Sequence, residues 1–290
     1  MTTRKILYYI YFSIIVIIMI VFFVRLFLLD DHVEHNTVKY KLEHQGFQVF
    51  KNVIDPNKIQ EFTHLCKNQD YKGVKTQIMQ EKKLERLIQN TLETDYQLQD
   101  YIWIIEKSVV HTCHRDNNGD FFNTGQKHPS YTMLIYLENM EKCLGVIPYS
   151  HTNKTTKHMN LLFDEVVNLK CNAGDIILFN ANLIHVGCIN KKDDHLRIQL
   201  KVSHKDDLNV LQYYQDFNKV LNKDNSLPVS LRKAQRNFSC MFPVISDLTQ
   251  GENIRTSRGS DNGIDVGGSQ KWFSYLFYGN KDFYDLPNAF

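Results

Sequence analysis

The sequence predicts a mainly β domain with flanking helices (α+β), built as a sandwich or barrel, behind one N-terminal transmembrane helix. Three observations lead to this prediction. Residues 6–24 form an uncharged apolar segment, short strand-like runs follow one another from Tyr101 onward, and stretches with helical spacing flank those runs. Many short strands separated by turn residues are typical of sandwiches and barrels.

The apolar segment comes first in the chain. Its nineteen residues, ILYYIYFSIIVIIMIVFFV, contain no charged side chain. As a helix they extend about 28 Å at roughly 1.5 Å per residue, which matches the apolar core of a bilayer. A cleaved signal peptide is the alternative, but its apolar region has only about 7 to 15 residues and precedes a small-residue cleavage site, which this sequence lacks. We therefore expect residues 1–29 to be an uncleaved anchor, in contact with the lipid bilayer through residues 6–24.

The charges beside the segment favour one orientation. Arg4 and Lys5 precede the segment, whereas Arg25 is followed by Asp30 and Asp31. Because positive residues tend to stay on the cytoplasmic side, we expect a single-pass protein with a cytoplasmic N-terminus and a lumenal or external body. Arg25 is a counter-signal to this orientation.

The remaining composition excludes some classes of protein. Residues 1–29 contain three basic side chains and no acidic one, which leaves 31 basic against 32 acidic side chains in the other 261 residues. Binding to nucleic acid requires a clustered excess of basic residues, so we expect no nucleic-acid partner. The six cysteines form no C-x-x-C motif, which argues against a zinc ribbon or a redox dithiol and leaves disulfides open. The sequence does not indicate an oligomeric state.

A polar linker, residues 30–37, leads into the domain that we expect at residues 38–205. Asp55 followed by Pro56 is typical of a helix start. Residues 75–98 are rich in Gln, Glu, Lys and Leu, with apolar positions three and four apart, and predict a helical region packed on the surface of the core.

The residue patterns of the strand-rich part of the domain and of the C-terminal region differ. The predicted strands are YIWII, SVVHT, YTMLIYL, GVIPYS, DIILF, NLIHVG and LRIQLKV. Beyond them, residues 206–223 keep one apolar face at helical spacing and predict a helix. Residues 250–270 predict a loop, and the aromatic run WFSYLFY after it is expected to pack back on the core. Together, residues 206–290 form an extension packed on the domain.

One group of residues in the strand-rich region indicates metal chemistry. His114 and Asp116 are two positions apart at the end of a strand-like run, so both side chains point the same way. His185 closes another run, 69 residues after Asp116. Two histidines and one carboxylate on one side of a metal form the ligand set of non-haem Fe(II) oxygenases. An H-x-D tripeptide alone is more often part of a surface loop, so the prediction depends on the combination.

An arginine follows at an inward position of the next strand. In LRIQLKV the apolar residues occupy one face, and Arg197 and Gln199 occupy the other. A guanidinium group inside a barrel needs a carboxylate partner, and its planar fork suits a bidentate organic acid. Lys201 is the next basic residue on the same face, and it is the alternative partner for such an acid.

In these residues the sequence resembles the phytanoyl-CoA dioxygenase family. That family is a branch of the Fe(II)- and 2-oxoglutarate-dependent oxygenases, which are built on a double-stranded β-helix, or jelly roll. The resemblance extends over about residues 42–204. It comprises GFQVFKNVID, HRD, GVIPYSHTNK, AGDIILFNANLIHVGCIN and Arg197. It implies His114, Asp116 and His185 as iron ligands, Arg197 as the partner of the distal carboxylate of 2-oxoglutarate, and ascorbate as a candidate reductant.

Three departures from the family pattern have structural consequences. Tyr149 stands where the family usually has Gly, so the local turn is expected to differ. Gly187 stands where Ser is frequent, which removes one hydroxyl contact to the cosubstrate. The interval from His185 to Arg197 is one residue longer than usual, and the extra residue is expected within residues 191–195. The family's halogenating members replace the carboxylate ligand, which this chain retains at position 116, so hydroxylation is favoured.

These observations predict a membrane-anchored Fe(II)- and 2-oxoglutarate-dependent dioxygenase that releases succinate and CO2. The substrate is a small molecule or a lipid, because the anchor places the site beside a membrane. Two alternatives stay open: a prolyl- or lysyl-type hydroxylase that acts on protein side chains in the secretory pathway, and a jelly-roll binding protein that has lost turnover. Substrate class does not transfer within such a family.

Overall fold

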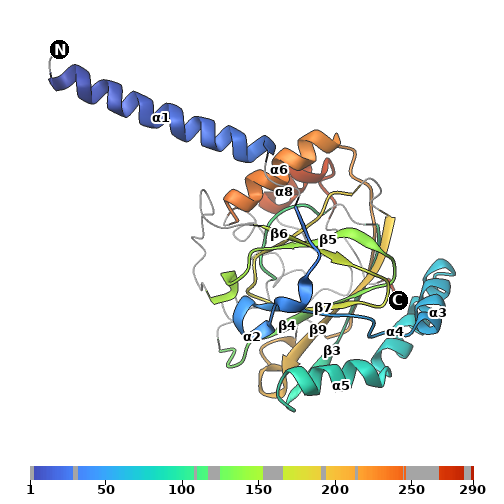
Figure 1. Cartoon of the computed structure of the whole chain (residues 1–290). Helices are drawn as coiled ribbons and strands as arrows, with labels where there is room; N and C mark the ends of the chain where they lie inside the picture. Colours follow the sequence, from blue (N-terminus) through green and yellow to red (C-terminus); the bar gives the residue numbers. More distant parts are fainter. Residues whose placement is uncertain are drawn as a thin grey trace.

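The structure is a computed structural model, and it describes residues 3–28, 32–107, 110–116, 125–152, 166–190, 194–212, 215–243, 245, 268–283 and 289–290 (Figure 1). The helices are α1 Thr3–Leu28, α2 Leu42–Gln45, α3 Pro56–Lys67, α4 Tyr71–Met79, α5 Lys82–Thr91, α6 Val229–Met241 and α8 Gly268–Tyr278. Short 3-10 turns lie at η1 Thr37–Lys39, η2 Ser150–Thr152 and η3 Lys205–Asp207.

The body is built on two sheets. The strands are β1 Val33–Glu34, β2 Phe47–Phe50, β3 Tyr96–Lys107, β4 Tyr131–Tyr136, β5 Met140–Val146, β6 Val167–Cys171, β7 Ile176–Asn180, β8 His185–Gly187, β9 Asp194–His204 and β10 Phe217–Asn222. One sheet has the order β10-β3-β9-β4-β7-β2 and the other the order β1-β6-β5-β8. The chain crosses between them from β4 to β5, from β6 to β7, from β7 to β8 and from β8 to β9, in the manner of a jelly roll. The predicted fold class is therefore confirmed.

The two sheets enclose one part of the core. Strands β2, β4 and β7 of the larger sheet turn apolar side chains toward β5 and β6 of the smaller sheet. The buried side chains of this layer are Phe47, Val49, Leu134, Tyr136, Met140, Cys143, Leu144, Val146, Leu169, Cys171, Ile177, Phe179 and Leu183. Because side chains alternate along a strand, the intervening residues of β4, β7 and β9 face the other side of the larger sheet.

Helices α3, α4 and α5 cover that other side (Figure 1). Their apolar faces pack on β3, β4 and β9 through Phe62, Val74, Ile78, Leu84 and Ile88. The predicted start of a helix at Asp55 and Pro56 is confirmed, since Pro56 is the first residue of α3. The region expected to be helical at 75–98 forms two helices and the start of β3, because Glu81 caps a new helix and the chain is extended from Tyr96.

The N-terminal helix leaves the body on the side where α6 and α8 lie (Figure 1). Among the described residues, one helical segment, Lys5–Phe27, is long and apolar enough to cross a membrane, and the body does not bury it. The end of α1 contacts α6, where the side-chain amide of Asn237 donates to the carbonyl oxygen of Leu26 at 3.0 Å. Residues 246–267, which include most of the loop expected at 250–270, lie outside the described residues.

The helix predicted for residues 206–223 is wrong, because its described residues form the end of the 3-10 turn η3, further turns and a strand. Residues 217–222 form β10, which pairs in parallel with β3, so this strand of the larger sheet lies within the expected extension. The ring of Phe217 stacks on Tyr101 at a centroid distance of 4.2 Å. Phe217 and Leu221 are four residues apart, so they would lie on one face of a helix and also on one face of a strand. The pairing with β3 favours the strand. The expected linker likewise contains β1, which pairs with β6.

Candidate metal centre

A backbone bridge brings the two predicted histidine ligands together. Residues 110–116 run beside β8, and the amide of His114 donates to the carbonyl of His185 at 2.9 Å while the amide of His185 donates back to the carbonyl of His114 at 2.9 Å. In such an antiparallel pair the side chains lie on the same face. The imidazole rings therefore lie next to each other, with their centroids 4.4 Å apart.

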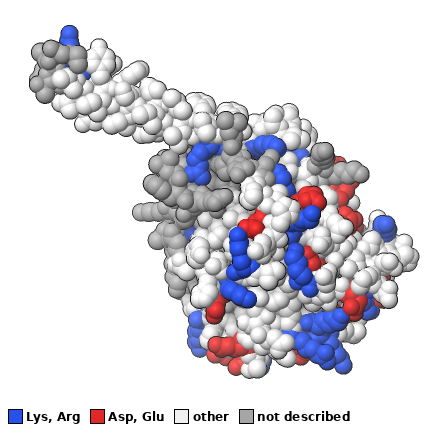
Figure 2. All heavy atoms as spheres, viewed as in Figure 1, with Lys and Arg blue, Asp and Glu red and all other residues white. Residues whose placement is uncertain are grey.

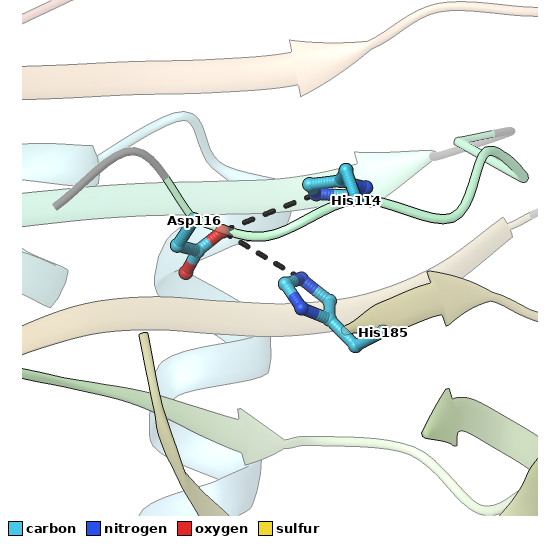
Figure 3. Close-up of side chains that lie close together, drawn as sticks. All are labelled: His114, Asp116 and His185. Carbon is cyan, nitrogen blue, oxygen red and sulfur yellow. Dashed lines mark ion pairs between the residues drawn. The ribbon is translucent and has the colours of Figure 1, made fainter. Parts of the chain in front are cut away.

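Asp116 completes the group (Figure 3). Its Oδ1 atom lies 3.6 Å from Nε2 of His185 and 3.9 Å from Nε2 of His114. One ligand atom from each of the three residues lies within 4.8 Å of the other two. The three residues that the sequence singles out thus meet at one point inside the jelly roll.

Hydrogen bonds fix which ring nitrogens face this point. Nδ1 of His114 lies 2.7 Å from the carbonyl oxygen of Thr112, and Nδ1 of His185 lies 3.0 Å from that of Leu183. A carbonyl only accepts, so each Nδ1 carries a proton, and Nε2 is the nitrogen that faces Asp116 and is left to bind a metal. Metal-binding histidines are oriented by a hydrogen bond of this kind. Two imidazoles and one carboxylate match the donor set for Fe(II).

Burial and charge favour the protonation states that a metal requires. His185 is buried, and burial lowers its pKa to about 4, with a further lowering from the neighbouring His114. Burial would raise the pKa of Asp116, but the positive charge of Lys201 and the two histidines outweigh it and hold that pKa well below its usual range. The carboxylate is therefore ionised and the imidazole of His185 neutral at pH 7, as metal ligation demands.

A buried lysine holds the second oxygen of Asp116. Lys201 is 1 % exposed, and its Nζ atom lies 2.5 Å from Oδ2 of Asp116 and 2.8 Å from Oγ1 of Thr132. The hydroxyl of Thr132 also donates to the same carboxylate oxygen. Lys201 and Thr132 are paired neighbours on β9 and β4. Oδ1 is thus left to face the two histidines. Strand alternation in the sequence predicts that Lys201 lies on the inward face of its strand. It does not predict the contact between Lys201 and Asp116.

Arg197 lies further along the same face of β9. It is half-buried and paired with Tyr136 on β4 and Ile105 on β3, and its Nη1 donates to the carbonyl of His195 at 3.1 Å. Four residues separate it from Lys201, or about 13 Å along a strand. The structure therefore places Arg197 on the predicted face, while its role toward 2-oxoglutarate stays a prediction.

Two of the departures from the family pattern now have physical explanations. A Cβ atom on Gly187 would lie 1.7 Å from the carbonyl oxygen of Val110, so only glycine lets the segment before His114 pass this close to β8. Tyr149 has a φ of 68°, in the left-handed region that favours glycine. The turn therefore has a left-handed residue at Tyr149, and whether it differs from the turn of other family members stays a prediction. Of residues 191–195, expected to absorb the extra residue, 191–193 lie outside the described residues.

A second group of potential ligands is less suitable. His128, His204 and Asp206 also bring ligand atoms within 4.8 Å of one another. However, the backbone amide of Asp206 donates to Nδ1 of His204 at 3.2 Å, so the other nitrogen of the neutral ring carries the proton. The rings of His128 and His204 stack at 3.7 Å. This group is a local packing arrangement beside η3.

Comparison with known proteins identifies the family. Residues 44–197, more than half of the chain, match the family model "Phytanoyl-CoA dioxygenase (PhyH)". The chain belongs to the phytanoyl-CoA dioxygenase family. Like other members, it is an enzyme of the Fe(II)- and 2-oxoglutarate-dependent oxygenase type, with iron as cofactor and 2-oxoglutarate as cosubstrate, as the sequence predicts. All three candidate ligands and Arg197 lie within the matched residues.

Several solved structures are similar at low identity. SnoN, a non-haem α-ketoglutarate-dependent epimerase from nogalamycin biosynthesis, is 15% identical over 57% of this chain and 80% of its own, with a TM-score of 0.45. HygX from Streptomyces hygroscopicus, with nickel and 2-oxoglutarate bound, is 13% identical over 60% and 88%, with a TM-score of 0.43. AviO1 from Streptomyces viridochromogenes Tue57 is 11% identical over 61% and 97%, with a TM-score of 0.44. No curated protein matches the chain by sequence.

Proposed function

We propose that this family member is a membrane-anchored hydroxylase in which His114, Asp116 and His185 hold Fe(II). The observation that supports this most directly is the pair of Nε2 atoms directed at Oδ1 of Asp116, with each Nδ1 held by a backbone carbonyl. Bound iron supplies the oxidative decarboxylation of 2-oxoglutarate to succinate and CO2, coupled to hydroxylation of a C–H bond. Retention of a carboxylate at position 116 favours hydroxylation.

In this proposal the chain's own residues orient the ligands and limit access of water. Lys201 and Thr132 fix one oxygen of Asp116, so the carboxylate presents the other to the metal. The ring of Phe179 packs on His185, with centroids 4.6 Å apart, and gives one side of the site an apolar wall. Arg197 would pair with the distal carboxylate of 2-oxoglutarate through its planar fork.

The anchor is the second part of the proposal. The segment Lys5–Phe27 has 23 residues and extends about 34 Å as a helix, which is enough to cross the apolar core of a bilayer of about 30 Å. Arg4 and Lys5 favour a cytoplasmic N-terminus, with the catalytic body in the lumen or outside the cell. A site tied to a membrane in this way suits a lipid or a small-molecule substrate. A prolyl- or lysyl-type protein hydroxylase is the alternative substrate class.

Uncoupled turnover tests the catalytic part without knowledge of the substrate. The full chain, purified in mild detergent, is mixed with Fe(II), 2-oxoglutarate and O2, and succinate is measured. We expect iron-dependent succinate formation by the wild type and by His44→Ala, since His44 is exposed on α2, and none by His185→Ala. Equal succinate formation by His185→Ala would contradict the ligand assignment. Iron-loaded wild type without any turnover would instead favour the binding-protein alternative.

A carbonate wash tests the anchor independently. We expect the full chain to stay in the membrane pellet and residues 32–290 to appear in the supernatant, because Lys5–Phe27 is the one described segment able to cross a bilayer. Recovery of uncleaved full chain in the supernatant would refute the anchor. It would leave the iron site untouched, because succinate formation is measured in solution.

A further inference from the structure

A small cavity lies where α1 meets the body. Its volume is about 50 Å³, and its wall includes Phe27 at the end of the apolar helix, Cys188 just after β8, and residues of β5, β6 and α6. On this measure one water molecule needs roughly 10 to 15 Å³, so the cavity has room for a small polar group. Because Phe27 ends the membrane-crossing segment, the cavity would lie at the depth of the lipid headgroups if α1 spans a bilayer.

The charge of the cavity wall is positive. Lys142, Lys233 and Arg236 contribute to the wall, and among the described residues no acidic side chain lines it. Arg236 is 6 % exposed and held in place, since its Nη2 donates to Oδ1 of Asn168 at 2.5 Å and its Nε to the carbonyl of Gly187 at 3.3 Å. Lysine and arginine side chains also gather on the surface where α1 joins the body (Figure 2). Such a wall attracts an anion.

The surface of the neighbouring helices α6 and α8 is unusually apolar for a face in contact with water. Trp272, Tyr275 and Leu276 on α8 are each more than half exposed, and Leu231 on α6 is 44 % exposed. Helix α8 is fastened to α6, because the amide of Gln235 donates to the carbonyl of Leu276 at 2.6 Å. Exposed Trp and Tyr rings are favoured at the interface between lipid and water, so this face suits contact with headgroups.

We propose that the cavity binds the phosphate of an anionic phospholipid headgroup and thereby seats the catalytic body on the membrane surface. The inference rests on the proposed membrane anchor, because Phe27 ends the membrane-crossing segment at the side of the body. Cationic pockets beside membrane-spanning helices are known to select anionic headgroups. The fixed guanidinium group of Arg236 and the two lysines would surround the phosphate.

Lipid retention tests this proposal. The full chain is reconstituted in vesicles of phosphatidylcholine with about one fifth phosphatidylserine, washed with carbonate, extracted gently, and analysed for retained lipid by mass spectrometry. Since each basic residue near the surface favours anionic lipid by about fivefold, we expect the ratio of phosphatidylserine to phosphatidylcholine among the retained lipids to be about fivefold or more above the bulk ratio. The double variant Lys142→Gln, Lys233→Gln should lose most of this enrichment, and Lys142→Arg, Lys233→Arg should behave as wild type.

The matched control removes the same charge elsewhere. Lys67→Gln, Lys82→Gln changes two exposed lysines at the end of α3 and the start of α5, away from α1, and should keep the enrichment. Bulk-share retention by a wild type that stays in the carbonate-washed membrane overturns the headgroup site alone. Release of the wild type by carbonate overturns the anchor and the site together. Displacement of phosphatidylserine by millimolar inorganic phosphate shows a site for free anions and overturns the lipid assignment.

Discussion

The ammonium group of Lys201 lies 2.5 Å from Oδ2 of Asp116, so a fully buried cation is paired with a candidate iron ligand. Breaking a buried ion pair from one side is costly, because the remaining charge is left without a partner in a poorly polar environment. The pair therefore links the stability of the jelly roll to the residues that would bind the metal.

The variant Asp116→Ala should lose both the proposed iron ligand and the ion pair with Lys201. We expect no Fe(II) binding and no succinate formation, and a fall of about 3 kcal/mol in the free energy of unfolding of the metal-free protein, because buried Lys201 loses the carboxylate that pairs with it. Asp116→Asn keeps an oxygen that accepts from Lys201 and should unfold less readily than Asp116→Ala. Thermal unfolding and iron analysis measure both effects. Wild-type iron content in Asp116→Ala would remove this residue from the ligand set.

In the variant Lys201→Met, bound Fe(II) should contribute more to the stability of the fold than it does in wild type. Without the lysine, the carboxylate of Asp116 lacks its main counter-charge until Fe(II) binds. The variant also lacks the positive charge of Lys201, which repels a divalent cation in wild type. We expect Fe(II) to bind about tenfold more tightly, or about 1.4 kcal/mol, and to raise the melting temperature more than in wild type. Lys219→Met, at a buried lysine on β10, is the control and should leave iron affinity unchanged. Weaker iron binding by Lys201→Met would contradict this electrostatic account.

Local patterns of the sequence predict much of this site. The spacing of His114 and Asp116 and the position of His185 at a strand end are local features, and so is the alternation that turns Arg197 and Lys201 inward. The contact of Lys201 with Asp116 is different, because it depends on the register of β4 on β9 and on the path of residues 110–116. Neither follows from local sequence.

Contacts between distant segments also explain why β10 forms where the sequence predicts a helix. Apolar positions of residues 206–223 fit a helix, but Phe217, Lys219 and Leu221 also alternate as in a strand, and pairing with β3 settles the matter. Tertiary contacts of this kind override local propensity. The close approach of Val110 to Gly187 is equally a property of the assembled sheets, and it explains the glycine only after the structure is known.

The metal-free protein should lose stability in mild acid. Burial lowers the pKa of His185 to about 4, against about 6.5 in an unfolded chain, so the unfolded state binds more protons between these values. Stability is therefore complete above about pH 6.5 and falls by up to about 3 kcal/mol as the pH drops to about 4. Melting temperatures of wild type and His185→Gln at pH 7 and pH 5 measure the effect. Parallel losses in the two proteins would show that His185 does not cause it.

Arg197 can be tested separately from the iron ligands. Arg197→Lys keeps the charge but loses the planar fork, and should raise the 2-oxoglutarate concentration for half-maximal succinate formation by roughly ten- to a hundredfold, or about 1.4 to 2.7 kcal/mol. Arg197→Ala should raise it further, and Fe(II) affinity should change little in either variant. Unchanged 2-oxoglutarate dependence in both would assign the carboxylate to another residue, and Lys201 on the same face would be the first to examine.

The absorbance of the anaerobic Fe(II) protein during titration with 2-oxoglutarate tests the central claim most directly, because a metal-to-ligand charge-transfer band requires both cofactors at one site. For the full chain in detergent we predict a saturable band in wild type and in His44→Ala, and no band in His185→Ala or Asp116→Ala. A band of wild-type strength in His185→Ala, or no band in a wild type that holds one Fe(II) per chain, would contradict the assignment of His114, Asp116 and His185 as the iron site.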